Sequence, residues 1–162
     1  MYKRLELHNH TNESDAVFTC KELTDFMVAD QVDAFALTDH NTISGHCKIK
    51  NYLKEHPQPI DFIPGMEYTT YYGHILCLNL TEYVPWENIT RHKPELLFRA
   101  ARKKGALVGV AHPYSFGWPF AQGCRFEMTI TDYSCCDFIE IFNNPEPLHE
   151  VNEKGVKLWE NL

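Results

Sequence analysis

The sequence predicts an α/β fold in which a largely parallel sheet is connected by crossover helices. Short segments rich in apolar, β-branched and aromatic residues alternate with longer segments of helical periodicity, which is the pattern of consecutive strand–helix units. Residues able to bind metal follow several of these predicted strands, and sites of parallel α/β folds collect beyond the carboxyl ends of their strands. Together the two observations favour a barrel or an open sheet with one site at the strand ends.

The first strand–helix unit carries the clearest local signals. A strand is expected over residues 2–7, and Thr19 with Glu22 three residues later forms the capping-box pattern of a helix N-terminus. Leu23 and Met27 then share one face of the predicted helix. The segment therefore predicts a strand followed by an amphipathic helix.

The remaining elements continue this alternation. A second helix is expected over residues 44–55, and Pro94 and Gly105 mark the start and end of a third. Pro64-Gly65 is expected to turn the chain after the third strand, and the segments on either side of Gly73 are compatible with a hairpin. The expected strands cover residues 2–7, 33–37, 60–63, 68–72, 75–80, 106–110 and 138–142, a loop that walls the pocket covers 113–128, and a last helix begins at His149.

The composition fits one globular domain over residues 1–162. The chain has 162 residues and a mass of 18.9 kDa, too little for two well-buried cores. Its 15 Lys and Arg against 22 Asp and Glu give a net charge of −7, the wrong sign for attracting a nucleic-acid backbone. The apolar runs are too short to cross a membrane and no secretory signal pattern opens the chain, so we expect a cytoplasmic protein without a membrane partner. Its six cysteines, none in a Cys-x-x-Cys spacing, are expected to be reduced and mostly buried.

His8-Asn9-His10 follows the first predicted strand. Side chains of an extended segment alternate between its two sides, so both imidazoles are expected on the same side, where they could share a metal ion. With nine histidines in the chain this spacing also arises by chance, so the motif alone does not separate a metal site from structural histidines. Its position beyond a strand is what favours a site.

Ligand-type side chains also follow three later strands. The second strand ends in Thr38-Asp39-His40-Asn41, Glu67 follows the third, and His112 follows the strand over 106–110. One buried histidine is usually structural, but four strands with such endings are expected to surround one barrel mouth. Imidazole and carboxylate groups are ligands of zinc, iron and manganese. A single Glu67 bridging two ions would suit phosphoester chemistry, because paired metals clamp a phosphoryl group.

Other residues are assigned supporting roles. Asp15 and His74 are placed to reach the same mouth. Asp39 is suited to accept the ring N–H of a ligand histidine, while capping, orienting and structural roles are all open for Asn41 and Asn143. Four further histidines are taken as non-ligands: His46, His56, His92 and His149.

Several segments match the motifs of one known family, in the family's order and across nearly the whole chain: Leu7–Thr11 with Ser14-Asp15, Leu37–Gly45, Ile63–Glu67, Gly73–Leu76, Ala111–Pro113 and Ile139–Asn143. On these motifs the sequence resembles the PHP (polymerase and histidinol phosphatase) domain family of metal-dependent phosphoesterases. The resemblance implies a distorted seven-stranded TIM-like barrel that holds two or three divalent ions, such as Zn, Mn or Fe.

The resemblance also implies the ligands and the chemistry. The metal ligands carried over by motif are His8, His10, Asp15, His40, Glu67, His74 and His112. Glu67 would bridge two ions, one of them held also by His74 and His112, and Glu67 and His40 would act in catalysis through a metal-bound hydroxide. The implied reaction is hydrolysis of a small phosphomonoester or nucleotide, with no covalent nucleophile on the protein.

The sequence departs from the family near its end. The family has an Asp-x-His segment there that supplies two ligands, and this chain has none; its 162 residues are also few beside a barrel of about 250. We therefore expect a truncated chain with an incomplete barrel, reduced metal occupancy and a free strand edge open to self-association. Two alternatives to an active phosphoesterase stay open: a catalytically incomplete metal-binding or accessory PHP-like module, and an amidohydrolase-type metal hydrolase, which also begins with His-x-His.

Overall fold

The computed structural model describes residues 2–114, 125–143 and 150–162. Most of the predicted loop over 113–128 and the predicted helix start at His149 therefore lie outside the described residues. The chain forms two compact units: unit 1 contains Met1–Glu67 and Leu78–Tyr83, and unit 2 contains Tyr68–Cys77 and Val84–Leu162. No helix in the described part of the chain has the length and apolar character needed to span a membrane.

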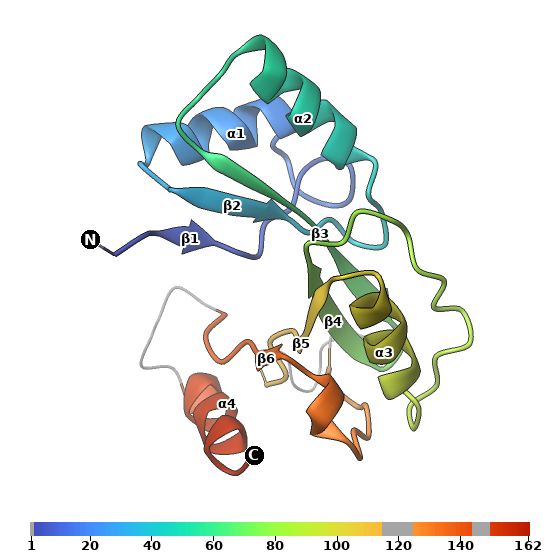
Figure 1. Ribbon diagram of the computed structural model, residues 1–162. Coiled ribbons are helices and arrows are strands. Elements are labelled where there is room, and N and C mark those ends of the chain that lie inside the picture. Colours follow the sequence, from blue (N-terminus) through green and yellow to red (C-terminus); the bar gives the residue numbers. More distant parts are fainter. Residues whose placement is uncertain (1, 115–124, 144–149) are drawn as a thin grey trace. The chain divides into compact units, whose positions relative to one another are not determined.

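Unit 1 is built on parallel strands and two helices. Its elements are β1 (Leu5–Glu6), α1 (Cys20–Ala29), β2 (Ala34–Leu37), α2 (Gly45–Glu55) and β3 (Asp61–Thr70), the last of which continues into unit 2. Strand β2 pairs in parallel with both β1 and β3, so that Phe35 lies opposite Glu6 on one side and Phe62 on the other. Helices α1 and α2 contact each other and lie over one face of these strands (Figure 1). The predicted order of two strand–helix units and a third strand is confirmed.

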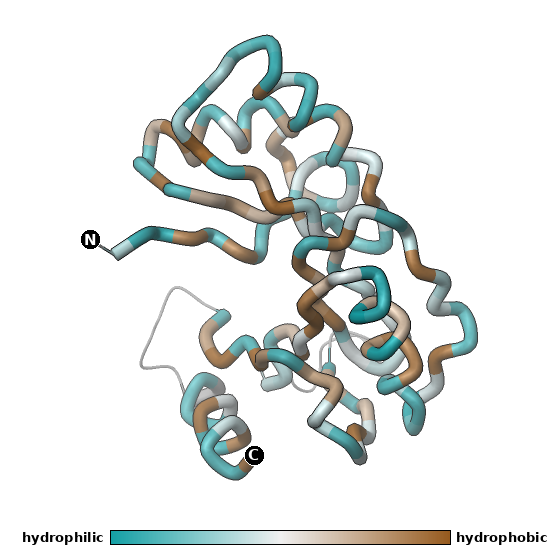
Figure 2. Tube along the Cα trace, in the orientation of Figure 1, coloured by the Kyte–Doolittle hydropathy of each residue, from teal (hydrophilic) through white to brown (hydrophobic). Residues whose placement is uncertain are grey.

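The hydrophobic core of unit 1 lies between β2 and the two helices. All four residues of β2 are buried, because this strand has a neighbour on each side. Phe35 is fully buried, in a cluster with Leu23 and Met27 of α1 and Ile49 of α2. In Figure 2 hydrophobic residues recur along β2 and β3, whereas the turns of α2 are mostly hydrophilic. Each helix thus contributes one apolar face to the core.

The capping box predicted at the start of α1 is confirmed. Thr19 Oγ1 accepts a hydrogen bond from the Glu22 backbone N–H at 3.2 Å, and the Glu22 carboxylate accepts one from the Thr19 backbone N–H at 2.8 Å. The hydrogen bonds from Thr19 lower the pKa of Glu22, because they favour its charged form. Local contacts alone therefore define where α1 begins.

The turn predicted at Pro64-Gly65 is wrong, because β3 runs through both residues. Pro64 has no N–H to leave unpaired, and its carbonyl oxygen accepts a hydrogen bond from the Leu80 N–H at 2.9 Å. Both backbone polar atoms of Gly65 meet the ring of His46: its nitrogen lies 3.2 Å and its carbonyl oxygen 2.7 Å from His46 Nε2. Contacts with distant parts of unit 1 thus keep this segment extended.

Unit 2 contains the end of β3 and three further strands. Its other elements are β4 (Gly73–Leu78), α3 (Glu95–Lys103), β5 (Leu107–Val110), the short 3-10 helix η1 (Tyr133–Cys135), β6 (Phe138–Ile139) and α4 (Glu150–Glu160). Strands β3 and β4 are hydrogen-bonded neighbours, and Thr70 Oγ1 donates to the Gly73 carbonyl oxygen at 2.7 Å in the connection between them. The hairpin compatible with the sequence is therefore present. Strand β6 is shorter than the strand predicted over 138–142, and η1 has no counterpart among the predicted elements.

The strands are hydrogen-bonded in the order in which they occur along the chain, β1-β2-β3-β4-β5-β6. Parallel pairs occur in both units, since β1, β2 and β3 pair in parallel and so do β5 and β6. These features confirm the predicted α/β class. The described residues contribute six strands, against the seven that the family resemblance implies.

The buried cysteines behave largely as the composition predicts. Cys20, Cys77 and Cys135 are buried, whereas Cys47 is exposed on α2. Burial raises the pKa of the Cys77 thiol far above its ordinary value, so this thiol stays protonated at neutral pH. Cys77 therefore acts as a small apolar residue of unit 2.

We expect His46 to make the stability of unit 1 depend on pH. Burial is the largest influence on His46 and lowers its pKa below the ordinary 6.5, although the Gly65 carbonyl acts in the opposite direction. On acidification through 6.5 the unfolded chain therefore takes up a proton that the folded chain resists, and the free energy of unfolding falls. Urea unfolding at about pH 7.5 and pH 5.5, with metal chelated, should show a smaller loss for His46→Gln than for the parent chain. The exposed His56, which follows the end of α2, supplies the control, His56→Gln, and equal losses in all three proteins would contradict the prediction.

Candidate metal centre

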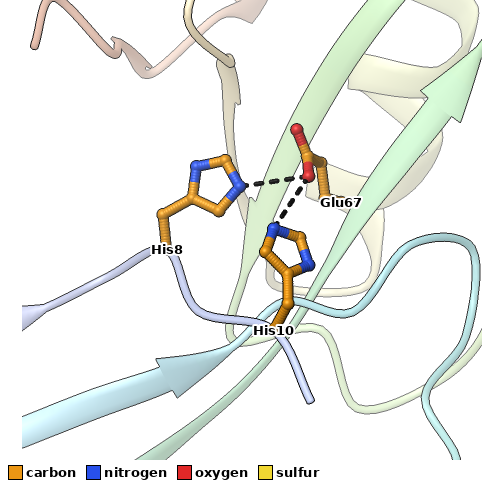
Figure 3. A group of neighbouring side chains, drawn as sticks. All are labelled: His8, His10 and Glu67. Atoms are coloured by element: carbon orange, nitrogen blue, oxygen red, sulfur yellow. Dashed lines mark ion pairs between the residues drawn. The ribbon is translucent and has the colours of Figure 1, made fainter. Parts of the chain in front are cut away.

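His8 and His10 lie after β1 and point toward Glu67 of β3 (Figure 3). His8 Nε2 is 3.1 Å and His10 Nε2 is 3.2 Å from the same carboxylate oxygen, Oε2 of Glu67. The intervening Asn9 faces elsewhere, since its side-chain amide donates hydrogen bonds to two backbone carbonyl oxygens of unit 1. The alternation of side chains along this segment thus brings two imidazoles to one carboxylate.

His40 reaches the same oxygen from the segment that follows β2. Its Nδ1 lies 3.1 Å from Glu67 Oε2, and its ring stacks on that of His10 with the ring centroids 4.4 Å apart. A parallel bridge pairs His40 with Glu67, and the Asn41 N–H donates to the Glu67 carbonyl oxygen at 3.0 Å. Three imidazoles from two chain segments therefore converge on one oxygen atom.

Asp15 approaches His40 from the opposite edge of its ring. Asp15 Oδ2 is 3.5 Å from His40 Nε2, whereas Glu67 lies at Nδ1 of the same ring. The Asp15 side chain is 67% exposed and that of Glu67 only 1% exposed. We call the following five residues the unit 1 cluster: His8, His10, Asp15, His40 and Glu67. The cluster thus has one buried carboxylate, that of Glu67, and one exposed carboxylate, that of Asp15.

The unit 1 cluster fits a metal site. Ligand atoms of His8, His10 and Glu67 lie within 4.8 Å of one another, and so do those of His10, Asp15 and His40. His10 Nδ1 is buried and has no hydrogen-bond partner among the described residues. A buried carboxylate beside several imidazoles requires compensating positive charge, which protons on the rings or bound cations would supply. Imidazole together with carboxylate is a donor set of zinc, iron and manganese.

His74 and His112 lie in unit 2, the first in β4 and the second just after β5. Both side chains are nearly buried, and their rings meet edge to face with the centroids 5.0 Å apart. His112 has a φ of +27°, and its N–H donates to Glu140 Oε2 at 2.8 Å. The structure thus brings these two predicted ligands together within unit 2. That they share an ion with Glu67 stays a prediction.

Asp39 is buried, and its hydrogen bonds reach the loop that follows β1. Its carboxylate accepts hydrogen bonds from the Thr11 N–H, the Thr11 hydroxyl and the Ser14 hydroxyl. The role predicted for Asp39, which was to accept a ring N–H from a ligand histidine, stays a prediction. Thr11 and Ser14 belong to the first sequence motif, but the sequence does not predict a function for either. Both are hydroxyl residues beside candidate ligands, which is a weak signal because such residues are common in loops.

The other residues singled out in the sequence lie outside the unit 1 cluster. Asn143 is half-buried after β6, and its orienting role stays a prediction. Among the histidines taken as non-ligands, His46 is buried, His56 and His92 are exposed, and none of these three belongs to a group of converging ligand atoms. His149 lies outside the described residues.

Comparison with known sequences finds the PHP domain and several of its relatives. The PHP domain family model matches residues 6–112. An uncharacterised protein of Methanocaldococcus jannaschii is 28% identical over 151 residues, which cover 86% of this chain and 81% of that protein. A 5'-3' exoribonuclease of Haemophilus influenzae is 35% identical over 89 residues, which cover 52% of this chain and only 32% of that protein.

Comparison with solved structures finds the same fold. A two-domain Bacteroides vulgatus protein described as containing a PHP-like metal-dependent phosphoesterase has a TM-score of 0.66 and 22% identity, covering 86% of this chain and 44% of that one. A Bifidobacterium adolescentis protein described as a metal-dependent phosphoesterase has a TM-score of 0.67 and 13% identity, covering 99% of this chain and 84% of that one. The family match includes every residue of the unit 1 cluster together with His74 and His112, and it extends over well more than half of the sequence. This chain therefore belongs to the PHP domain family.

Proposed function

We propose that this chain hydrolyses phosphate esters with divalent metal ions held by the unit 1 cluster. The observation that supports this most directly is the convergence of His8, His10 and His40 on one oxygen of Glu67, at 3.1–3.2 Å. Such a concentration of nitrogen ligands around one buried carboxylate is typical of a metal centre. Membership of the PHP domain family supports the same chemistry.

The residues of the unit 1 cluster would have different roles, according to their positions. Glu67 offers one buried oxygen to several neighbours, and the three histidines place ring nitrogens around it. Divalent ions bound there would supply an activated water and would offset charge on the phosphoryl oxygens. Asp15 is exposed, so the cluster is open to a phosphate group from solvent on the side of this residue.

We propose a small phosphomonoester or a nucleotide as the substrate. The net charge of −7 disfavours tight binding of a long anionic polymer, whereas a single phosphate needs only the local charge of the ions. The 35% identity with an exoribonuclease over 52% of this chain favours a second candidate, a phosphodiester of RNA. Both reactions break a phosphorus–oxygen bond, and they differ in the leaving group.

The test is phosphate release by the metal-stripped chain after it is reloaded with Mn²⁺, Zn²⁺ or Fe²⁺. The substrates are p-nitrophenyl phosphate, a 5'-nucleotide and a short 5'-phosphorylated RNA, with an amide substrate for the amidohydrolase alternative. We expect metal-dependent hydrolysis of at least one phosphate ester, lost on chelation and in His8→Ala. His92→Ala, which changes an exposed histidine outside the cluster, serves as the control and should keep full activity.

Three results would contradict this proposal in different ways. A chain that binds no metal would show that the unit 1 cluster is not a metal site. A chain that binds metal yet cleaves none of the esters would favour the accessory module. Hydrolysis of the amide alone would favour the amidohydrolase alternative.

A further inference from the structure

The segment after β2 holds the loop after β1 on both sides of His10. Before His10, the Asn9 N–H donates to Thr38 Oγ1 at 3.0 Å, and the Thr38 N–H donates to the Asn9 carbonyl oxygen at 2.9 Å. After His10, the Thr11 N–H donates to Asp39 Oδ1 at 2.6 Å, and the Thr11 hydroxyl donates to Asp39 Oδ2 at 2.7 Å. His10 is therefore flanked by two residues that are each tied to the strand end carrying His40.

Ser14 extends this network to Asp15. Its hydroxyl oxygen lies 2.7 Å from Asp39 Oδ1 and 3.3 Å from Asp15 Oδ1. The loop also closes on itself, because the Ser14 and Ala16 N–H groups both donate to the Thr11 carbonyl oxygen, at 3.1 and 3.2 Å. Asp39 thus contacts Thr11, which follows His10, and Ser14, which precedes Asp15.

The burial of this network makes its hydrogen bonds important. Asp39 is 1% exposed and Thr11 is fully buried, so water does not replace a missing partner of either residue. A carboxylate acts only as an acceptor, and the three donors from Thr11 and Ser14 match that requirement. If Asp39 were replaced by an apolar residue, these donors would compete for new partners and the loop would lose its defined conformation.

We propose that Asp39 is a positioning residue that fixes the loop between His10 and Asp15, through Thr11 and Ser14, so that both ligands face His40. This inference rests on the proposed function, because that function requires the ligands of the unit 1 cluster to be held in position. It differs from the role predicted from the sequence, in which Asp39 would accept the ring N–H of a ligand histidine. The first role depends on the contacts with Thr11 and Ser14, and the second depends on a contact with an imidazole.

Cobalt binding tests the network through its hydroxyl groups. Co²⁺ titration of the metal-stripped chain, followed by its visible absorption, should show an affinity lower by about 10- to 100-fold in Ser14→Ala and in Thr11→Val. The matched control is Ser134→Ala, which removes a hydroxyl that donates to the Asp132 carboxylate in unit 2 and should leave the affinity unchanged. Unchanged affinity in both Ser14→Ala and Thr11→Val would overturn the proposal.

The pair Asp39→Asn and Asp39→Ala separates the positioning role from a role of charge. Asparagine keeps an acceptor oxygen for the Thr11 N–H and the Ser14 hydroxyl, and its amide group can donate to the Thr11 hydroxyl. We therefore expect Asp39→Asn to retain most of the Co²⁺ affinity that Asp39→Ala loses. An asparagine variant that binds as poorly as the alanine variant would overturn the proposal.

Amide hydrogen exchange in the metal-stripped chain tests the loop without any metal. In Ser14→Ala and in Asp39→Asn we expect the amide protection of α1 to stay near that of the parent chain. In Asp39→Ala the amides of Thr11, Ser14 and Ala16 should lose more protection than the amides of α1. Equal protection of the loop in the parent chain and in Asp39→Ala would overturn the proposal. If the parent chain binds Co²⁺ but hydrolyses no ester, the proposed function is wrong and this inference is unaffected. If the parent chain binds no Co²⁺, the hydrogen-exchange result still decides whether Asp39 holds the loop.

Discussion

Replacement of Glu67 by glutamine is expected to abolish tight metal binding while the chain stays folded. Glu67 Oε2 lies within 3.2 Å of nitrogens from three histidines, so all three share this carboxylate as a neighbour. Loss of a residue that merely supports a ligand lowers metal affinity by about 10- to 100-fold, and loss of this shared ligand should cost at least about 100-fold. Glutamine has nearly the same shape as glutamate, so we expect the packing of unit 1 around this position to be kept.

Metal content after dialysis and the metal-induced rise in melting temperature measure this effect. The parent chain should retain metal and gain melting temperature on its addition, whereas Glu67→Gln should do neither. Glu55→Gln changes an exposed glutamate at the end of α2 and should behave as the parent chain does. Full metal content in Glu67→Gln would show that the imidazoles bind ions without this carboxylate. Loss of helical circular dichroism would mean instead that Glu67 is needed for folding.

Replacement of Phe35 by alanine should have the largest effect on stability. Phe35 is fully buried in the middle strand of unit 1, and its ring lies 5.6 Å from that of Phe62. Removal of a buried phenylalanine ring costs about 3–5 kcal/mol, from lost burial and from the cavity that remains. The midpoint of urea unfolding of the metal-stripped chain should therefore fall strongly.

The same substitution at an exposed position provides the control for Phe35→Ala. Phe26 is 52% exposed on α1, so Phe26→Ala should cost less than about 1 kcal/mol. Similar midpoints for the two variants would mean that the core of unit 1 does not depend on β2 as the burial indicates. A drop confined to Phe35→Ala would locate the stability of unit 1 in the packing of this strand.

The sequence predicts those elements whose signals are local. The capping box at Thr19 and Glu22 needs only residues three apart, and the structure reproduces both of its hydrogen bonds. Pro64-Gly65 is a local turn signal as well, but it fails, because Leu80 and His46 supply partners that keep the strand extended. Propensity is a weak guide wherever distant residues satisfy the backbone.

The candidate site also has features that the sequence predicts and features that it does not. The spacing of His8 and His10 predicts that both imidazoles lie on one side of the chain, and in the structure both face Glu67. Their meeting with His40 follows from parallel pairing, which the alternation of elements predicts. The network of Asp39 with Thr11 and Ser14 is not predictable, because it depends on how two loops of unit 1 approach each other.

The parallel alignment of β1, β2 and β3 has a consequence for how the site can fail. Strand neighbours are fixed residue by residue, with Leu5 opposite Ala34 and Ala34 opposite Asp61. Slippage of β1 by one residue would exchange inward for outward side chains, so that Asn9 would replace one imidazole of His8-Asn9-His10 and Leu7 or Thr11 would replace the other. Metal affinity is thus a readout of strand alignment, and a genetic screen for weak metal retention should recover core substitutions far from any ligand.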